Sequence, residues 1–279
     1  MDGQVKIGRL TVKKAQIQDI LLKVNAKDGI INMDPMKLNL YQGNIDGKGT
    51  LNVKKDTPSS AVNLKINSVQ IGPLLKDVAE KDILEGTTQA AIDLAMSGDN
   101  AELIKKTITG KGDLVFTDGA IKGIDLANMV RNVQSAFGLA EKGAEKPRTD
   151  FAELSMPFTL NKGLFDTPET SLKSPFIRLT ASGTADLVKE ELNFRVEPKA
   201  VASIKGQGDT TQRSGIMVPI LVSGTFAAPK FRPDLSAATK QQIEQKITES
   251  KEFKKVFEKE ELKPHEEKAK ELLKGILNK

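Results

Sequence analysis

Alternation of apolar and polar positions is the dominant pattern along the chain from Val5 to Phe226. It is clearest in "AVNLKIN" (61–67), "AAIDLAM" (90–96), "ELSMPFTL" (153–160) and "ELNFRVE" (191–197). Because successive side chains of a strand point to opposite faces, each segment predicts an antiparallel strand with one apolar and one polar face. Turn signals separate such segments at "KDG" (27–29), "TDG" (117–119) and "NKG" (161–163). The spacing predicts more than ten strands.

A glycine-containing phrase recurs at the start of three alternating segments. It reads "GKGTLNV" (47–53), "GKGDLVF" (110–116) and "ASGTADL" (181–187). A phosphate-binding loop would need a third glycine and a following helix, and these stretches have neither. We therefore interpret the glycines as bends or bulges between strands.

Helical patterns interrupt the alternation in three short places, at 72–84, 100–108 and 125–137. Pro73 suits the first turn of the first helix, and Asn100 and Asp125 suit the N-caps of the other two. Three short helices are too few to cover the apolar faces of so many strands. The sheet must fold over on itself or leave an apolar face for something else to fill.

The last 44 residues have a different composition from the rest of the chain. The segment 236–279 contains eleven lysines and nine glutamates, and its final part, from Pro264, carries Ala269, Leu272, Leu273, Ile276 and Leu277 at helical spacing. We expect a β-rich domain over 1–235 and a charged amphipathic helical tail over 236–279. The tail is either a solvated hairpin docked on the end of the sheet or a helix for a membrane surface or partner.

Composition limits the classes of protein to which the chain can belong. With 279 residues, 38% hydrophobic and 28% charged, it is long enough to bury a core and is not of disordered composition. The sequence has no run of about 18 apolar residues, so it predicts no membrane-spanning helix. The start, "MDGQVKIGRL", does not resemble a signal peptide, so the protein stays in the cytosol or a leader has been removed. The net charge of +5 permits contact with anionic phosphate groups but is also typical of a basic surface with no specific partner.

Residues suited to catalysis or metal binding are scarce. The chain has no cysteine and one histidine, His265, so we expect no metal site and no catalytic nucleophile. Its carboxylates, such as Asp118 and Asp166, lie mostly at expected turns, where aspartate is favoured for conformational reasons. Aromatic residues make up 4% of the chain, with no tryptophan and a single tyrosine, Tyr41. The flat rings on which sugars or nucleic-acid bases stack are therefore scarce. We expect no enzyme, no cofactor and no nucleic-acid partner.

One stretch near the end of the alternating region carries a family likeness. The segment "VPILVSGTFAAPKFRPDL" (218–235) resembles the closing motif of the AsmA-like family, Pro-x-x-x-x-Gly-Thr-Phe-x-x-Pro-x-Phe. Further matching stretches occur in the expected order at 38–51, 83–98, 110–131, 149–165 and 176–198. The resemblance covers nearly all of 1–235. Within the closing motif, we expect one last strand that Pro229 and Pro233 stop, because proline donates no ladder hydrogen bond.

The resemblance implies a cellular setting and a function that the residues alone do not give. AsmA-like proteins are anchored in the inner membrane of Gram-negative bacteria and project into the periplasm. They form elongated, curved β-sheets with a hydrophobic groove, similar to bridge-like lipid transfer proteins, and are implicated in phospholipid transport and outer-membrane assembly. This chain lacks the N-terminal anchor helix, so the resemblance implies that it is the C-terminal periplasmic part of an inner-membrane-anchored protein.

The fold expected is mainly β, an elongated and curved antiparallel sheet folded on itself around an apolar groove. We expect phospholipid acyl chains to bind there without catalysis, and envelope proteins are possible further partners. The alternative is a purely structural outer-membrane assembly factor with a closed core. The residues predicted to line the groove are Ile92, Leu94, Met96, Leu114, Phe116, Leu154, Met156, Phe158, Leu160, Ile177, Leu179, Leu192, Phe194, Val196, Ile220 and Val222.

Overall fold

One antiparallel sheet makes up most of the part of the chain that the computed structural model describes, residues 1–123, 147–175, 177–200 and 219–234. Within these residues thirteen strands pair in strict sequence order, β1 beside β2 and so on to β13. The strands are β1 (Asp2–Val12), β2 (Ala15–Lys27), β3 (Ile30–Leu40), β4 (Gly43–Asn52), β5 (Ser59–Gln70), β6 (Leu84–Ser97), β7 (Thr109–Lys122), β8 (Arg148–Asn161), β9 (Leu164–Lys173), β10 (Ile177–Asp186), β11 (Glu191–Ala200), β12 (Ile220–Thr225) and β13 (Pro229–Pro233). The prediction of a mainly β, antiparallel fold with more than ten strands is confirmed.

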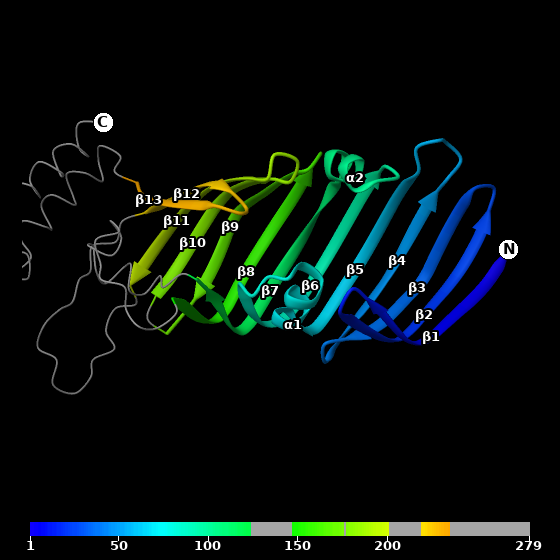
Figure 1. The fold of residues 1–279 in the computed structure, drawn as a ribbon, viewed down its shortest axis with the longest axis horizontal. Coiled ribbons are helices and arrows are strands. Elements are labelled where there is room, and N and C mark those ends of the chain that lie inside the picture. Colours follow the sequence, from blue (N-terminus) through cyan, green and yellow to red (C-terminus); the bar gives the residue numbers. More distant parts are fainter. Residues whose placement is uncertain (124–146, 176, 201–218, 235–279) are drawn as a thin grey trace, which may run out of the picture.

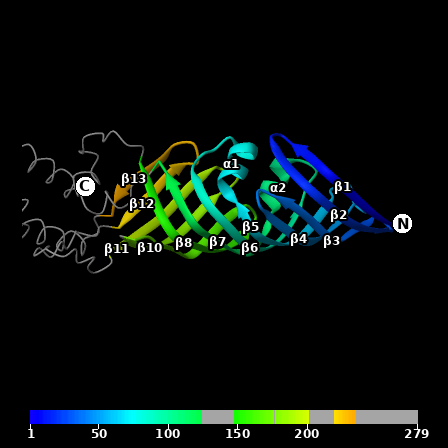
Figure 2. The same cartoon turned by 90° about the horizontal axis from the view of Figure 1, so that it is seen from below.

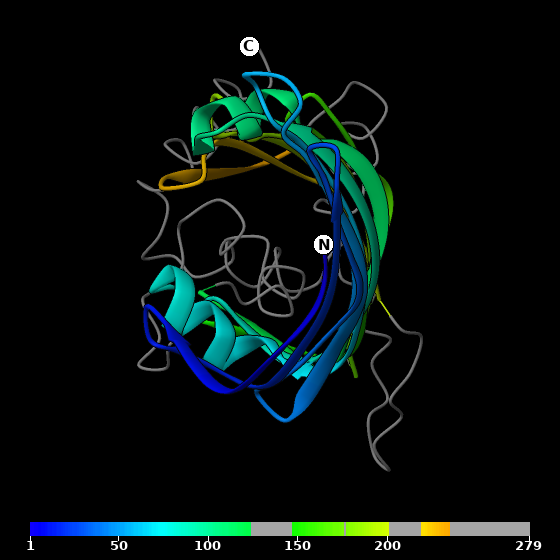
Figure 3. The ribbon, with the colours of Figure 1, turned by 90° about the vertical axis from the view of Figure 1, so that its right-hand side faces the viewer.

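The sheet is long, twisted and bent. Figures 1 and 2 show the strands lying side by side along the long axis and running obliquely to it. Viewed along that axis, the strands bend into an arch that is open on one side (Figure 3). The sheet stays open, because β1 and β13 each have a single neighbour in the strand order. The expected curvature is therefore present without closure of the sheet on itself.

Two short helices lie at the strand ends. Helix α1 (Ile71–Ala79) joins β5 to β6, and α2 (Ala101–Thr107) joins β6 to β7. We call the corresponding edges of the arch the α1 rim and the α2 rim. The side chain of Asn100 accepts a hydrogen bond from the Leu103 N–H at 3.0 Å, which confirms the predicted N-cap of α2. The helix predicted at 125–137 and the tail at 236–279 lie outside the described residues.

Hairpin turns have the backbone that their sequences predict at two of three places. At 27–29 and 161–163 the turn residues Asp28, Gly29, Lys162 and Gly163 all have positive φ, the conformation of tight two-residue hairpins. The "TDG" signal at 117–119 was wrong as a turn, because it lies inside β7. Asp118 takes a left-handed φ of 49° there, at the point where the register between β6 and β7 shifts. Residues that are favoured in turns are also favoured in β-bulges, and Asp118 forms a bulge within β7 instead of a turn.

The closing motif forms a hairpin rather than one strand. The expected single strand is replaced by β12 and β13, which pair from Ile220 with Pro233 to Gly224 with Pro229. The two prolines stand at the two ends of β13. They therefore mark the beginning and the end of β13, the last strand of the sheet. The strand that they were expected to stop is β12.

Candidate functional site

The concave apolar face of the sheet is the candidate site, and cross-strand pairing defines it. Residues paired in an antiparallel ladder point to the same face. One such row runs through Phe116, Leu154, Leu172 and Leu179 on β7 to β10. Ile71 of α1 packs against the cluster that contains this row, and Figure 3 shows α1 inside the arch at its lower rim. The apolar face is therefore the inner face of the arch.

All sixteen residues predicted from the sequence lie on this one face. Rows of paired residues connect them from β6 to β12, for example Leu94 with Gly110 and Leu160, and Phe194 with Val222. Six of them are buried: Phe116, Leu154, Phe158, Ile177, Leu179 and Ile220. The other ten are half-buried: Ile92, Leu94, Met96, Leu114, Met156, Leu160, Leu192, Phe194, Val196 and Val222. The structure thus brings them together as a surface, and their role in binding stays a prediction.

The two halves of the concave face differ in how well they are packed. From β7 to β12 the face contains a buried hydrophobic cluster in which Leu172 is 1% exposed, Ile177 2% and Leu179 6%. From β3 to β6 the same face is largely half-buried, as at Met33, Leu64 and Ile92. A half-buried apolar side chain on the inner face still exposes apolar surface that a ligand could cover. Packing therefore leaves the β3–β6 half as the more accessible part of the face.

Sequence reasoning missed the contribution of the first five strands to this face. Val5, Leu22 and Met36 form one row across β1 to β3, and Ile45 pairs with Ile66 across β4 and β5. The signal was the same alternation of apolar and polar positions, which is present in "INMDPMKLNL" and "GNIDGKGTL". Bulges interrupt it, however: the registers of β2 with β3 and of β3 with β4 both shift. Such shifts disguise a period of two.

The recurrent glycines lie within strands on the concave face rather than between strands, but the expected bulge is present at Gly183, where the register of β9 with β10 shifts. Gly47 pairs with Leu64, and Gly112 pairs with Phe158. A Cβ atom on Gly112 would lie 2.8 Å from the Phe158 ring, and one on Gly47 would lie 2.8 Å from a Leu64 methyl carbon. Side chains converge on the inner face of a bend. Glycine therefore makes room at these positions for the large residue on the neighbouring strand.

The α1 rim is held by polar contacts from two hairpin turns. The Tyr41 hydroxyl, in the β3–β4 turn, donates to Asp77 Oδ2 of α1 at 2.7 Å. Burial and this hydrogen bond raise the pKa of Tyr41 to about 12. From the β1–β2 turn, Lys13 Nζ donates to the Val78 carbonyl at 2.7 Å, and Lys14 Nζ lies 3.1 Å from Glu80 Oε1. These contacts hold α1 against the inside of the arch.

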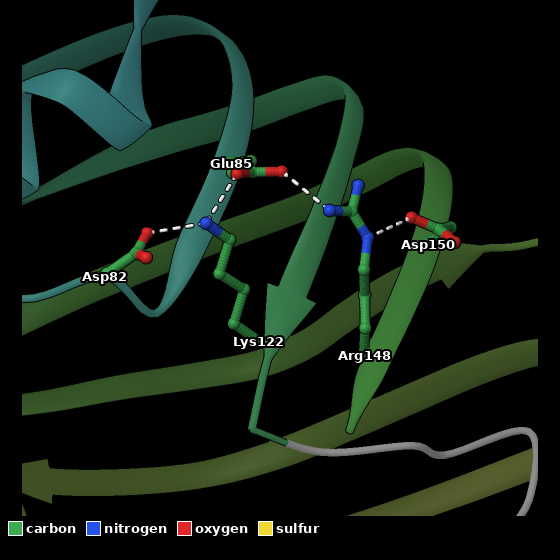
Figure 4. Close-up of polar contacts among 5 residues, drawn as sticks. All are labelled: Asp82, Glu85, Lys122, Arg148 and Asp150. Carbon is green, nitrogen blue, oxygen red and sulfur yellow. Dashed lines mark hydrogen bonds and ion pairs between the residues drawn. The ribbon is translucent and has the colours of Figure 1, made fainter. Parts of the chain in front are cut away.

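A cluster of five charged residues lies farther along the α1 rim, where β6 begins, β7 ends and β8 begins (Figure 4). Glu85 bridges two cations: its Oε1 lies 2.5 Å from Lys122 Nζ, and its Oε2 lies 3.1 Å from Arg148 Nη1. Asp82 Oδ1 lies 2.6 Å from Lys122 Nζ, and Asp150 Oδ1 lies 2.7 Å from Arg148 Nε. Hydrogen bonds to Asp82 and then Glu85 raise the pKa of Lys122, and the bond to Asp150 raises that of Arg148. Both cations are thus already matched by carboxylates.

The polar face carries two adjoining hollows. Their volumes are about 760 and 360 Å³, and both are lined by Thr50, Ala61, Ala95 and Thr109, which form one row across β4 to β7. Two of the predicted residues, Leu94 and Met96, are also among the lining residues. The row consists of small side chains between longer polar ones such as Lys48 and Lys111. The larger hollow is also lined by Asp34 and Asp93, so its acidic and basic side chains balance.

Chemistry beyond binding finds little support in the described ranges. Over residues 1–123, 147–175, 177–200 and 219–234, no group of three or more histidines, cysteines, aspartates or glutamates is placed to hold a metal ion. His265 lies outside these ranges. In the same ranges no helix is both long and apolar enough to cross a membrane. What the arrangement can do is to present apolar area along an arch.

A model of the AsmA family matches residues 1–170, which is more than half of the chain. The chain belongs to the AsmA family. It is also 21% identical over 191 residues to Protein AsmA of Escherichia coli strain K12. That alignment covers 68% of this chain and 31% of the relative, so the chain spans about a third of the length of the curated protein that it matches. No solved structure matches the chain.

Family membership agrees with the sequence-based resemblance and adds a setting. The AsmA family is a family of envelope proteins of Gram-negative bacteria and is not a known family of enzymes. Its link is to outer-membrane assembly or lipid transport. In the described part of this chain, the sequence pattern of the family folds into a thirteen-stranded open sheet with a concave apolar face.

Proposed function

We propose that the concave face is a groove for phospholipid acyl chains and that the chain is a non-catalytic lipid-binding or transfer module of the Gram-negative envelope. The carrying observation is that a continuous apolar face lines the inside of an open arch and is half-buried over most of its β3–β6 part, as at Met33, Leu64 and Ile92, although Val69 and Ala90 there are buried. A periplasmic position, an inner-membrane anchor in the full-length protein and contacts with other envelope proteins are parts of the same proposal. Membership in the AsmA family supports it.

The energetics of such a groove rest on apolar contact alone. Each methylene removed from water contributes roughly 0.8 kcal/mol. Half of a bilayer's ~30 Å hydrocarbon core, about 15 Å, is the length of one acyl chain, and strands lie about 4.8 Å apart. A chain lying across the strands would therefore cover about three strand spacings, which is the distance from β3 to β6. Binding of this kind tolerates changes in headgroup and depends weakly on salt.

The purely structural alternative also has an observation in its favour. The cluster around Leu172 and Leu179 is as well buried as the core of a closed domain. If the β3–β6 half were filled in the same way by another part of the protein, the sheet would be a scaffold and not a groove. The two functions therefore differ in what a charge placed on the β3–β6 half would do.

The test compares Ile92→Glu with Ala91→Glu. Ile92 is half-buried on the concave face, and Ala91, its neighbour, is exposed on the polar face. In an open groove, Ile92→Glu keeps the far-ultraviolet circular dichroism of the fold and abolishes binding of a fluorescent phospholipid, whereas Ala91→Glu changes neither. In a filled core, Ile92→Glu buries an unpaired charge and unfolds the sheet. Unfolding, or binding equal to that of Ala91→Glu, would overturn the groove.

A further inference from the structure

The two edges of the sheet are built differently, and β13 is the blocked one. The Asp234 N–H donates to the Pro219 carbonyl at 2.7 Å, so Asp234 directs its N–H toward β12. In an antiparallel ladder this orientation alternates, so Arg232 and Lys230 also face β12, while Pro229, Phe231 and Pro233 face the free edge. Two of these three positions lack an N–H. A further strand would thus find a single donor on this edge.

The β1 edge lacks this protection. Met1 and Ala26 exchange both backbone hydrogen bonds at 2.8 Å, so the alternation turns Asp2, Gln4 and Lys6 toward the free edge. None of them is proline, so each directs an N–H group toward this edge. The prolines of β13 therefore mark that end as one where the sheet stops. Whatever meets the β13 end does so by a means other than strand pairing.

The same end exposes two phenylalanines. Phe226, in the β12–β13 turn, and Phe231, within β13, are each 42% exposed. Phe231 pairs with Val222, which pairs with Phe194, so the row of the concave face reaches the edge of the sheet at Phe231. An exposed aromatic side chain beside an apolar row enlarges the apolar area at this edge, and an apolar phase would cover that area.

Two cations accompany these phenylalanines. Lys230 and Arg232 are exposed and pair with Ser223 and Leu221, which places them on the polar face. Within the described residues neither cation forms an ion pair, while the nearby Asp234 lies against Arg195. The β12–β13 hairpin therefore combines exposed aromatic rings with cations that are free to meet anions. That combination matches the boundary between headgroups and acyl chains in a bilayer.

We propose that the β12–β13 hairpin docks this end of the sheet on a phospholipid bilayer that carries anionic headgroups. Phe226 and Phe231 enter the interface, and Lys230 and Arg232 meet the phosphate groups. Docking brings the end of the concave apolar row, Phe194–Val222–Phe231, to the membrane surface. The proposal goes beyond acyl-chain binding in the arch, because docking requires only the hairpin.

The first experiment measures binding of the full chain to vesicles by co-sedimentation, with phosphatidylcholine alone and with added phosphatidylglycerol. Phe226→Ser/Phe231→Ser lowers the affinity about a hundredfold, since burial of each aromatic ring in the interface contributes about tenfold. The matched control, Leu10→Ser/Val12→Ser, removes apolar side chains that are 39% and 50% exposed at the opposite edge. It leaves binding unchanged.

Charge reversal tests the cations in the same assay. Lys230→Glu/Arg232→Glu lowers the affinity for phosphatidylglycerol vesicles more than tenfold at low salt, because each cation near an anionic surface contributes about fivefold. The difference shrinks as salt is raised. Lys6→Glu/Arg9→Glu changes the net charge equally at the exposed β1 edge and leaves binding intact. Equal losses for both pairs would show that only net charge matters and would overturn the hairpin site.

The absence of tryptophan from the sequence provides a direct readout of insertion. Phe231→Trp creates the sole tryptophan, and its emission moves to shorter wavelength and is quenched by brominated lipid when vesicles are added. Val12→Trp, the control, shows neither change. Failure of the wild-type chain to bind either vesicle, or an unchanged Phe231→Trp spectrum, would overturn docking and leave a protein as the occupant of the hairpin. Neither result bears on acyl-chain binding by the arch, which Ile92→Glu tests.

Discussion

Replacing Leu172 with alanine removes the most deeply buried large side chain of the concave face. Leu172 is 1% exposed and lies between its cross-strand partners Leu154 and Leu179, which are 8% and 6% exposed. Its neighbours are held by strands on both sides, so the space that it leaves collapses only partly. Leucine-to-alanine changes in such settings cost 2–5 kcal/mol, and we expect a loss of about 3 kcal/mol in the free energy of unfolding.

The matched change is Leu64→Ala on β5. Leu64 lies on the same face but is half-buried and outside the cluster around Leu172. Losing half of a leucine's burial predicts about 1 kcal/mol. Urea unfolding followed by circular dichroism at 25 °C measures both, with unchanged slopes as the sign that only stability changed. Equal losses for the two variants would refute the division of the concave face into a filled half and an accessible half.

Two further predictions follow from the glycine and tyrosine positions. Gly112→Ala would place a Cβ 2.7 Å from the Ala91 carbonyl oxygen, so we expect a loss of about 1–3 kcal/mol in the free energy of unfolding, measured in urea. A Cβ on the control, Gly8→Ala, would meet nothing within 4 Å, so this change should cost no stability. Equal urea midpoints for the two variants would contradict crowding on the inner face. Because the pKa of Tyr41 is raised from 10.0 to about 12 in the fold, its contribution is complete below pH 10 and is lost as the pH rises toward 12. Tyr41→Phe should flatten that part of the stability curve, and an identical pH dependence in both proteins would speak against the contact with Asp77.

The alternating segments contained most of the fold, because a period of two determines which side chains share a face. Ile92, Leu94 and Met96 could be assigned to one face from the sequence alone, and pairing then joined them to Leu160 and Val222. Short helices were also visible, as at the Asn100 cap. These features depend on residues that are close in the sequence, and they can therefore be predicted from short sequence patterns.

Features that depend on three-dimensional crowding were out of reach. Nothing in "TDG" distinguishes a turn from the bulge that Asp118 forms within β7. The glycines at 47 and 112 were taken for bends because the large partners that they face, Leu64 and Phe158, lie on other strands. The filling of one half of the concave face likewise depends on curvature and packing. Of the candidate site, the residues on β6 to β12 could be predicted, whereas those on β1 to β5, where bulges interrupt the alternation, and the accessibility of the face could not.

Strict pairing between sequence neighbours has a consequence for how such a sheet assembles and evolves. Among the strands that the structure describes, each pairs only with the strands before and after it in the chain, so the length of the sheet is set by the number of hairpins. Loop closure stays inexpensive at each step, which favours zipper-like folding from any well-packed hairpin outward. Gain or loss of a hairpin by duplication or deletion would lengthen or shorten the arch without rewiring it. Reach then becomes a quantity that evolution can adjust in steps of two strands.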